Sequence, residues 1–469
     1  MDEFGTKLAI REMEWVLGKT FLIALVLTPI ARDIFRAYNI VDRPGVRKVH
    51  AYPIPRLGGI SLAVAYLFGF SGLMHDPALA WKILPGAGVI FAVGILDDFF
   101  NLPPRLKLAG QILAACIAFW GGLRVPGPVP VSFILTLGWL LVATNAFNLV
   151  DGLDGLCAGV GLIATMTMFG AGYLEPGTLE GGLALQAMTL PLAGALLGFL
   201  CYNFSRATMF LGDSGALLIG FLVGCSGLLW TQQTPSRVAM TAPILACAIP
   251  LLDLFLSITR RFIQQKPIFS ADRRHMHHRL LDRGLTARGA VVRLYIWAAF
   301  GSILALLLGY RSIDPHWHWV TLAAFCFTTW AGIRQLRYSE FKVTARLLMR
   351  GEFRQALQGR MRIQDLIDAL QQSQTEDQWW GQLAQAAREA GWSAQWRSKD
   401  SVRREARSGE AGLSNPRWSF QVALAGDEAV RLDGMLPLAQ PPLDLLAFAE
   451  AVQNSFTARH RVWKQPELS

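Results

Sequence analysis

The stretch VSFILTLGWLLVATNAFNLVDGLDGLCAGVGLIATMTMFG, residues 131–170, places a short polar segment between two long apolar runs. Each run approaches the length of about 20 residues that a helix needs to cross the hydrocarbon core of a bilayer. The polar segment carries an amide and two carboxylates, on Asn148, Asp151 and Asp154. Because ionisable groups at the edge of a membrane are costly, the stretch predicts two membrane-spanning helices joined by a functional loop.

The same pattern recurs along the chain, which has 469 residues, of which 52% are hydrophobic and 17% charged. A soluble protein would carry about 25% charged residues. The composition therefore predicts an all-α polytopic membrane bundle of about eleven transmembrane helices. The mixed charge before the first block predicts no cleaved signal peptide. The apolar blocks lie at approximately 15–34, 57–74, 83–96, 107–123, 131–147, 155–173, 183–202, 211–230, 238–259, 291–309 and 317–334.

Basic residues gather in every second loop between these blocks, most densely over 32–56 and 260–288. The alternate loops carry only a few, namely Lys82, Arg124, Arg237 and Arg311. The positive-inside rule then places the basic loops in the cytoplasm, with the N-terminus outside and the C-terminus inside. The net charge of +10 is explained by this asymmetry, and we expect no nucleic-acid partner.

The composition changes after residue 336, where charged amphipathic sequence replaces apolar blocks. We expect a membrane domain over 1–336 and a small cytoplasmic α/β domain over 337–469, with a regulatory or oligomerisation role and a homodimer as one outcome. Within it, the segment 375–397 predicts a helix that ends at Gly391, and RWSFQVALAG (417–426) and AVRLDGMLPLA (429–439) have the pattern of strands. A closing helix is expected over 441–463.

Every concentrated polar motif falls on the predicted cytoplasmic side, which indicates an active site at the inner membrane face. The motifs are VDRPGVRKVHAYPIPRLGG (41–59), GILDDFFNLPPRLKLAGQ (94–111), NLVDGLDGL (148–156), NFSRATMFLGDSGAL (203–217) and KPIFSADRRHMHHRLLDRG (266–284).

The acidic residues of these motifs suit a divalent cation. Asp97 and Asp98 follow an apolar run, at the predicted C-terminus of a helix, where the helix dipole disfavours negative charge. A functional role is therefore favoured over a solvated helix end. The pair either binds a divalent cation or divides into one ionised and one proton-accepting group. Oxygen ligands at Asn148, Asp151 and Asp154 favour Mg²⁺ or Mn²⁺ over zinc. The alternative interpretation is a turn capped by these side chains.

Asp213 lies between two glycines at the predicted start of a helix. It either approaches a metal-bound phosphate, with help from nearby backbone amides, or simply caps that helix.

Basic groups accompany the acids. His275, His277 and His278 lie among arginines, including Arg274, and suit contacts to a diphosphate or a sugar. Adjacent histidines make a poor zinc site, and contact with lipid headgroups is the remaining alternative. A cationic rim of Lys48, Arg56, Arg105 and Lys107 would attract phosphates.

Taken in order, RPGVRKVH…PRLGG, DDFFN, NLVDGLDG, FLGDSG and RRHMHHRLLDRG resemble the polyprenyl-phosphate N-acetylhexosamine-1-phosphate transferase family (glycosyltransferase family 4) over about residues 15–335. The resemblance implies transfer of a sugar phosphate from a UDP-N-acetylhexosamine to undecaprenyl or another polyprenyl phosphate, with Mg²⁺ and release of UMP. This is the first membrane step of cell-envelope glycan synthesis, such as that of lipopolysaccharide O antigen.

The HMHH form of the histidine motif resembles the GlcNAc branch of the family. A phospho-MurNAc-pentapeptide transferase of peptidoglycan synthesis is the alternative within the family, and a membrane transporter is the alternative from another class.

The resemblance also implies roles for individual residues. Asp97, Asp98, Asp151 and Asp154 are the expected catalytic residues, and Asp213, with Asn148 or Asp151, is expected to hold the metal. Asp97 or Asp98 would deprotonate or orient the lipid phosphate, while a two-step route through a carboxylate nucleophile remains open. Asn101 stands where some family members have a third aspartate. The expected substrate-binding residues are Lys48, His50, Asn101, Lys107, Asn148, Arg274, His275, His277 and His278.

Overall fold

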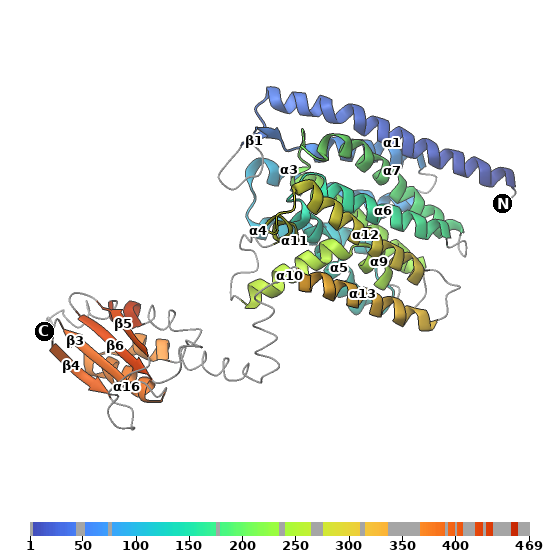
Figure 1. Cartoon of the computed structure of the whole chain (residues 1–469). Coiled ribbons are helices and arrows are strands. Elements are labelled where there is room, and N and C mark those ends of the chain that lie inside the picture. The colour runs from blue at the N-terminus through green and yellow to red at the C-terminus, as the bar shows by residue number, and fades with distance from the viewer. Residues whose placement is uncertain are drawn as a thin grey trace. The chain divides into compact units, whose positions relative to one another are not determined.

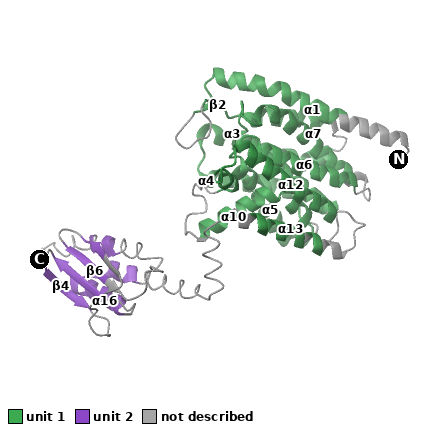
Figure 2. Ribbon diagram, viewed as in Figure 1, with its two compact units in different colours: residues 1–340 green, residues 341–469 purple. Residues whose placement is uncertain are grey.

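The chain divides into two compact units, Met1–Glu340 and Phe341–Ser469, which are coloured separately in Figure 2. The first unit is a helical bundle, and the second contains a small sheet (Figure 1). The computed structural model describes residues 3–43, 52–73, 77–174, 179–233, 240–263, 275–309, 315–335, 366–389, 393–398, 401–406, 418–424, 428–434 and 452–457.

The first unit is built almost entirely of helices, with one short antiparallel pair of strands, β1 (Val41–Asp42) and β2 (Ile54–Pro55). The helices are α1 (Glu3–Ala37), α2 (Gly58–Leu73), α3 (Pro77–Phe100), α4 (Pro104–Trp120), α5 (Val129–Val150), α6 (Leu156–Leu174), α7 (Leu179–Asn203), α8 (Gly212–Gln233), α9 (Thr241–Ala246), α10 (Ala248–Ile263), α11 (Met276–Leu281), α12 (Ala287–Gly309) and α13 (Pro315–Gln335).

Helix α8 forms the centre of this unit, because every residue from Ser214 to Thr231 is buried. It packs against α2, α3, α5, α6 and α7. Gly94 of α3 lies so close to α8 that an added Cβ would be 2.4 Å from the Cα atom of Ser214. The two helices therefore touch backbone to backbone, which brings the end of α3 to the beginning of α8.

Seven helices among the described residues are long and apolar enough to cross a membrane: α3, α5, α6, α8 and most of α1, α7 and α12. The other four expected blocks coincide with helices whose described residues do not form an apolar stretch long enough to cross a membrane. α2 has 16 residues and α4 has 17, the side chains of α13 are described only within the apolar stretch Trp319–Gly332, and the ninth block is interrupted at Cys247 between α9 and α10.

The outer surface of α1 also fits a membrane. Leu22, Val26, Ile30 and Ile34 are each about half exposed and repeat every four residues, so they form one apolar stripe. A soluble monomer rarely exposes so continuous an apolar surface. The apolar helices and this stripe are those of a multi-pass membrane protein.

The second unit contains a four-stranded antiparallel sheet in the order β4-β3-β6-β5. Its described elements are α16 (Glu376–Glu389), β3 (Ser393–Ser398), β4 (Ser401–Ala406), β5 (Trp418–Ala423) and β6 (Glu428–Gly434). Trp379 and Trp396 meet edge to face with ring centroids 5.6 Å apart, and Phe456 packs against both.

The sequence predicted part of this unit. β5 lies within the first segment predicted as a strand, β6 overlaps the second but begins one residue earlier, at Glu428, and residues 452–457 of the expected closing helix are helical. The predicted helix is α16, which ends at Glu389, close to the predicted end at Gly391, whereas the strand β3, which begins at Ser393, was not predicted. Ala394 and Trp396 alternate into the core there, a two-residue period that is typical of a half-buried strand.

Candidate active site

The ends of five helices meet around one cavity of about 470 Å³. α3 and α5 end there, α6 and α8 begin there, and α11 contributes one histidine. The lining residues are Asp42, Arg56, Asp97, Asp98, Asn101, Asp151, Gly152, Leu153, Asp154, Asn203, Phe210, Gly212, Asp213, His278 and Ala287. Described residues of all five polar motifs thus line the same cavity.

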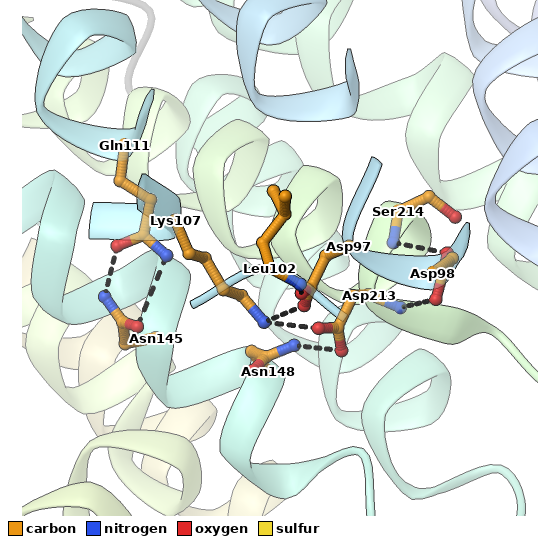
Figure 3. Close-up of polar contacts among 9 residues, drawn as sticks. All are labelled: Asp97, Asp98, Leu102, Lys107, Gln111, Asn145, Asn148, Asp213 and Ser214. Atoms are coloured by element: carbon orange, nitrogen blue, oxygen red, sulfur yellow. Dashed lines mark hydrogen bonds and ion pairs between the residues drawn. The ribbon is translucent and has the colours of Figure 1, made fainter. Parts of the chain in front are cut away.

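The ammonium group of Lys107, in the first turns of α4, joins two of the carboxylates. Its Nζ donates to Asp97 Oδ2 at 2.7 Å and also to Asp213 Oδ2, as Figure 3 shows. Asp213 Oδ1 accepts a hydrogen bond of 2.8 Å from Asn148 Nδ2. The remaining oxygen of Asp97 accepts one of 2.7 Å from the backbone amide of Leu102, which fixes the turn between α3 and α4.

These hydrogen bonds bring four polar residues into direct contact. The sequence patterns had predicted only that they lie on the same side of a membrane. Lys107 balances part of the negative charge of two carboxylates, which lie on different helices. A buried cation shared between carboxylates is costly unless each group keeps partners, and here each has at least two. Asp97, Lys107, Asn148 and Asp213 therefore form one connected polar network.

Asp98 is adjacent to Asp97 in sequence but has different partners. Its Oδ1 accepts a hydrogen bond of 2.9 Å from the amide of Asp213, and its Oδ2 accepts one of 3.0 Å from the amide of Ser214. These amides belong to the first turn of α8, whose N–H groups have no partner within the helix. Asp98 is only 6% exposed. It holds the start of α8 in place, and a catalytic role for it remains a prediction.

Gly212 explains how Asp98 comes so close to α8. Its φ is +74°, a left-handed conformation that glycine adopts without strain. An added Cβ would lie 2.1 Å from the carbonyl oxygen of Arg56 and 2.7 Å from Asp98 Oδ2. Arg56 in turn donates from its guanidinium to the carbonyl oxygen of Asp98. The predicted cationic rim thus contributes at least this arginine to the cavity wall.

The turn between α5 and α6 carries Asp151 and Asp154, which face different partners. Asp154 Oδ2 accepts a hydrogen bond of 2.9 Å from the amide of Ala207 and so anchors the 203–211 loop. Burial, together with the carboxylates of Asp213 and Asp98, raises the pKa of Asp151 to about 8. Asp151 therefore keeps a proton at neutral pH unless a cation replaces it.

Asn203 ties the same loop to this turn. Its Oδ1 accepts a hydrogen bond of 3.0 Å from the amide of Gly155, and its Nδ2 donates to the carbonyl oxygen of Met209 at 2.9 Å. The sequence prediction did not single out Asn203, Asp42 or Phe210, although all three line the cavity. Asn203 and Phe210 lie in the 203–217 motif quoted above. The amide side chain of Asn203, at the end of an apolar block in this motif, was the signal that could have indicated a role in the site.

The three histidines have three different environments. His278 lines the cavity, whereas His277 is 2% exposed and packs against Gly152, where an added Cβ would lie 2.4 Å from His277 Nε2. Burial lowers the pKa of His277 to about 3, so its ring is neutral at physiological pH. His275 is held by Asp253 of α10 through a contact of 3.1 Å between His275 Nδ1 and Asp253 Oδ2.

Among the predicted substrate-binding residues, Asn101 lines the cavity with a φ of +49°, and its backbone amide bonds to the carbonyl oxygen of Asp97. Lys48, His50 and Arg274 lie outside the described residues. Asp253 was not predicted, although an isolated acid in an apolar block is itself a signal that a polar partner exists.

The donor atoms in the cavity fit Mg²⁺ better than a metal that needs a closed cage. No group of three or more His, Cys, Asp or Glu side chains in the described part of the chain could hold a metal ion by itself. Mg²⁺ usually binds through one or two carboxylates and completes its shell with water and substrate phosphates. Asp213, with Asn148 beside it and Asp151 across the cavity, offers such an open set of oxygen ligands.

Comparison with known proteins agrees with this chemistry. Residues 80–231 match the model of the family described as "Glycosyl transferase family 4". The chain is 33% identical over 303 residues to the "Probable undecaprenyl-phosphate N-acetylglucosaminyl 1-phosphate transferase" of Bacillus subtilis (strain 168), covering 62% of this chain and 83% of that protein.

Two further relatives have the same kind of name. The chain is 32% identical over 349 residues to the "Decaprenyl-phosphate N-acetylglucosaminephosphotransferase" of Mycobacterium tuberculosis (strain ATCC 25618 / H37Rv), covering 66% of this chain and 86% of that one. It is 28% identical over 323 residues to the "Undecaprenyl-phosphate alpha-N-acetylglucosaminyl 1-phosphate transferase" of Escherichia coli (strain K12), covering 66% and 87%. The predicted resemblance is thereby confirmed, and the chain belongs to glycosyl transferase family 4.

Proposed function

We propose that this protein transfers N-acetylglucosamine-1-phosphate from UDP-N-acetylglucosamine to a polyprenyl phosphate in the membrane. An oxygen of the acceptor phosphate attacks the sugar-bearing phosphorus, and the bond from that phosphorus to UMP breaks. The products are UMP and a polyprenyl-diphosphate sugar. The observation that carries the proposal is the network of Asp97, Lys107, Asn148 and Asp213, of which the two acids line the cavity, in a chain whose relatives bear the names of such transferases.

The cavity has to bring together two anionic substrates, so positive groups are needed. A phosphate monoester has a second pKa of about 6 and is mostly a dianion at neutral pH. Lys107 supplies a donor beside Asp97, and Arg56 and His278 line the cavity. A magnesium ion held by Asp213, with Asn148 or Asp151, would neutralise further charge on the diphosphate.

The contacts of the two adjacent aspartates support a division of roles. Both acids line the cavity, but both oxygens of Asp98 accept from amides of α8, whereas Asp97 accepts from the ammonium group of Lys107. We therefore assign the contact with the acceptor phosphate to Asp97. Asp97 would orient that phosphate or accept its remaining proton, and Asp98 would keep Asp213 in position. A covalent route through a carboxylate remains an alternative for the same site.

The membrane arrangement is part of the same proposal. We infer eleven spans with the N-terminus outside and the catalytic cavity at the cytoplasmic face of a bacterial inner membrane, where UDP-sugars are present. The seven long apolar helices and the meeting of the described motifs at one cavity support it. The product would then begin the synthesis of a cell-envelope glycan.

The second unit has its own core around Trp379, Trp396 and Phe456, so we assign it a regulatory or dimerisation role outside the reaction. Removal of residues 341–469 should then leave UMP release intact in the membrane unit. Measurement of the oligomeric state of the truncated chain in detergent would distinguish the two roles. A truncated protein that folds but releases no UMP would contradict this assignment.

The relatives' names do not favour the phospho-MurNAc-pentapeptide alternative. The test is to incubate purified protein with undecaprenyl phosphate and either radiolabelled UDP-GlcNAc or UDP-MurNAc-pentapeptide. We expect labelled lipid and an equal amount of UMP from UDP-GlcNAc only, and a loss of at least about 100-fold in the Asp213→Asn variant. Product from the pentapeptide donor would reverse the choice of substrate. Uptake of UDP-GlcNAc into sealed vesicles without UMP release would favour a transporter.

A further inference from the structure

Asp253 makes two contacts with one short segment although it does not line the catalytic cavity. It lies in α10 and is 2% exposed. Its Oδ1 accepts a hydrogen bond of 2.7 Å from the backbone amide of Met276, and its Oδ2 lies 3.1 Å from His275 Nδ1. His275 is 7% exposed. A buried carboxylate with these two partners fixes both the backbone and a side chain at the start of α11.

The first contact replaces a local helix cap. His275 precedes α11 in an extended conformation, with φ −61° and ψ 158°, and its own side chain makes no capping hydrogen bond. The free amides of the first turn need an acceptor, and a negative charge is favoured near them. Asp253 supplies this acceptor from another helix, so the position of α11 depends on α10.

The second contact determines which nitrogen of His275 carries hydrogen. When Nδ1–H donates to a carboxylate, Nε2 of a neutral imidazole is left as an acceptor, and both nitrogens donate in the imidazolium. The contact also sets the orientation of the ring. His275 and His277 then stack with centroids 5.7 Å apart, and His277 meets His278 at 4.4 Å. His278 is the member of this row that lines the cavity.

We propose that Asp253 is a positioning residue that acts through His275 to place the histidine helix α11 against the diphosphate of the sugar nucleotide. The inference rests on the proposed function, because it takes UDP-GlcNAc as the ligand. His277 transmits the position by packing on Gly152, in the turn that contains Asp151 and Asp154. A displacement of α11 would therefore move His278, which lines the cavity, and also the turn around Gly152, against which His277 packs.

The Asp253→Asn substitution tests the proposal without removing volume. The amide oxygen of the new side chain can still accept from the amide of Met276, whereas its NH₂ group must donate to His275 Nδ1. The hydrogen on the imidazole then moves to Nε2, and the contact of His275 with a carboxylate is lost. Asp282→Asn is the matched control, because Asp282 is an exposed acid immediately after α11.

The measurements are kcat, KM for each substrate, the Kd of UDP-GlcNAc by calorimetry and the thermal unfolding temperature. For Asp253→Asn we expect KM and Kd for UDP-GlcNAc to rise by about 10- to 100-fold, as for other groups that orient a functional histidine. KM for polyprenyl phosphate and the unfolding temperature should stay close to those of the wild type. Asp282→Asn should match the wild type throughout.

A double-variant cycle shows whether Asp253 acts through His275. In a His275→Ala background, the further change Asp253→Asn should alter KM by less than about threefold, because coupled residues give non-additive effects. Independent effects of the two substitutions would overturn the proposal, as would a normal KM in Asp253→Asn alone. If the wild type bound UDP-GlcNAc but released no UMP, the proposed function would fail, while the Kd values would still test Asp253.

Discussion

The adjacent acids Asp97 and Asp98 should respond differently to the same change, aspartate to asparagine. Both Asp98 oxygens accept hydrogen bonds from the first turn of α8, at 2.9 and 3.0 Å. An asparagine can accept only one of them, and its NH₂ group would face the other amide. The resulting unsatisfied buried donor costs about 1–3 kcal/mol. Loss of negative charge at the helix N-terminus adds about 0.3–1 kcal/mol.

Together these costs weaken the start of α8 by about 1–4 kcal/mol. Because each 1.4 kcal/mol is a factor of ten, local opening of this turn should become about 10- to 1,000-fold more frequent. Hydrogen exchange of a peptide that contains Asp213 and Ser214 measures this opening directly. Turnover should fall as well, since Asp213 moves with the turn and loses its place beside Asn148 and Lys107.

Asp97→Asn is the matched comparison. Asp97 binds the amide of Leu102 and the ammonium of Lys107, and neither contact belongs to α8. It should therefore reduce turnover while the exchange of the α8 turn stays at the wild-type rate. Asp33→Asn, in an exposed pair with Arg32, controls for the loss of one acid. If Asp98→Asn abolished turnover with unchanged exchange at α8, Asp98 would take part in the chemistry and its capping role would be secondary.

Three further substitutions or conditions test other parts of the site. Gly212→Ala should lower both turnover and the unfolding temperature, because a Cβ at φ +74° would lie 2.7 Å from Asp98 Oδ2, and a normal unfolding temperature would contradict this. Gly152→Ala should raise KM for the sugar nucleotide without destroying the fold, since its Cβ would displace His277, and an unchanged KM would show that α11 tolerates the shift. The pKa of Asp151 is raised from its ordinary value of 3.8 to about 8, so between these pH values the folded protein holds a proton that the unfolded chain has released. The stability of the metal-free protein should therefore fall as pH rises through that window. Mg²⁺ competes with the same proton for Asp151. The apparent affinity for Mg²⁺ in a titration should therefore rise by up to about tenfold per pH unit toward pH 8. The Asp151→Asn substitution should flatten this pH dependence.

The sequence allowed the family, the helical membrane unit and the acidic motifs to be predicted, because these depend on local patterns. Apolar blocks of about 20 residues are visible in one dimension. The identity of Asp97, Asp151 and Asp213 as members of one site came from their position at the ends of such blocks, and the cavity brings all three together.

The partners of these residues could not be predicted, because they depend on contacts between distant segments. Asp98 and Asp213 are separated by 115 residues, and the backbone contact at Gly94 that joins their helices leaves no periodic signal. Asp253 and His275 are separated by 22 residues, part of which lies outside the described structure. The hairpin β3–β4 was not predicted for a local reason: burial alternates only over Ser393–Trp396 in β3, and β4 is mostly exposed, so neither strand has a long apolar period of two residues.

The central claim is that the cavity transfers a sugar together with its phosphate. It is tested most directly with UDP-GlcNAc labelled at the β-phosphorus, purified protein and undecaprenyl phosphate. The label should pass to the lipid product while unlabelled UMP is released in equal amount, and the Asp213→Asn variant should produce neither. If the label instead stayed with uridine as UDP while the sugar entered the lipid, the phosphorus would not be the reacting centre and the account would be contradicted.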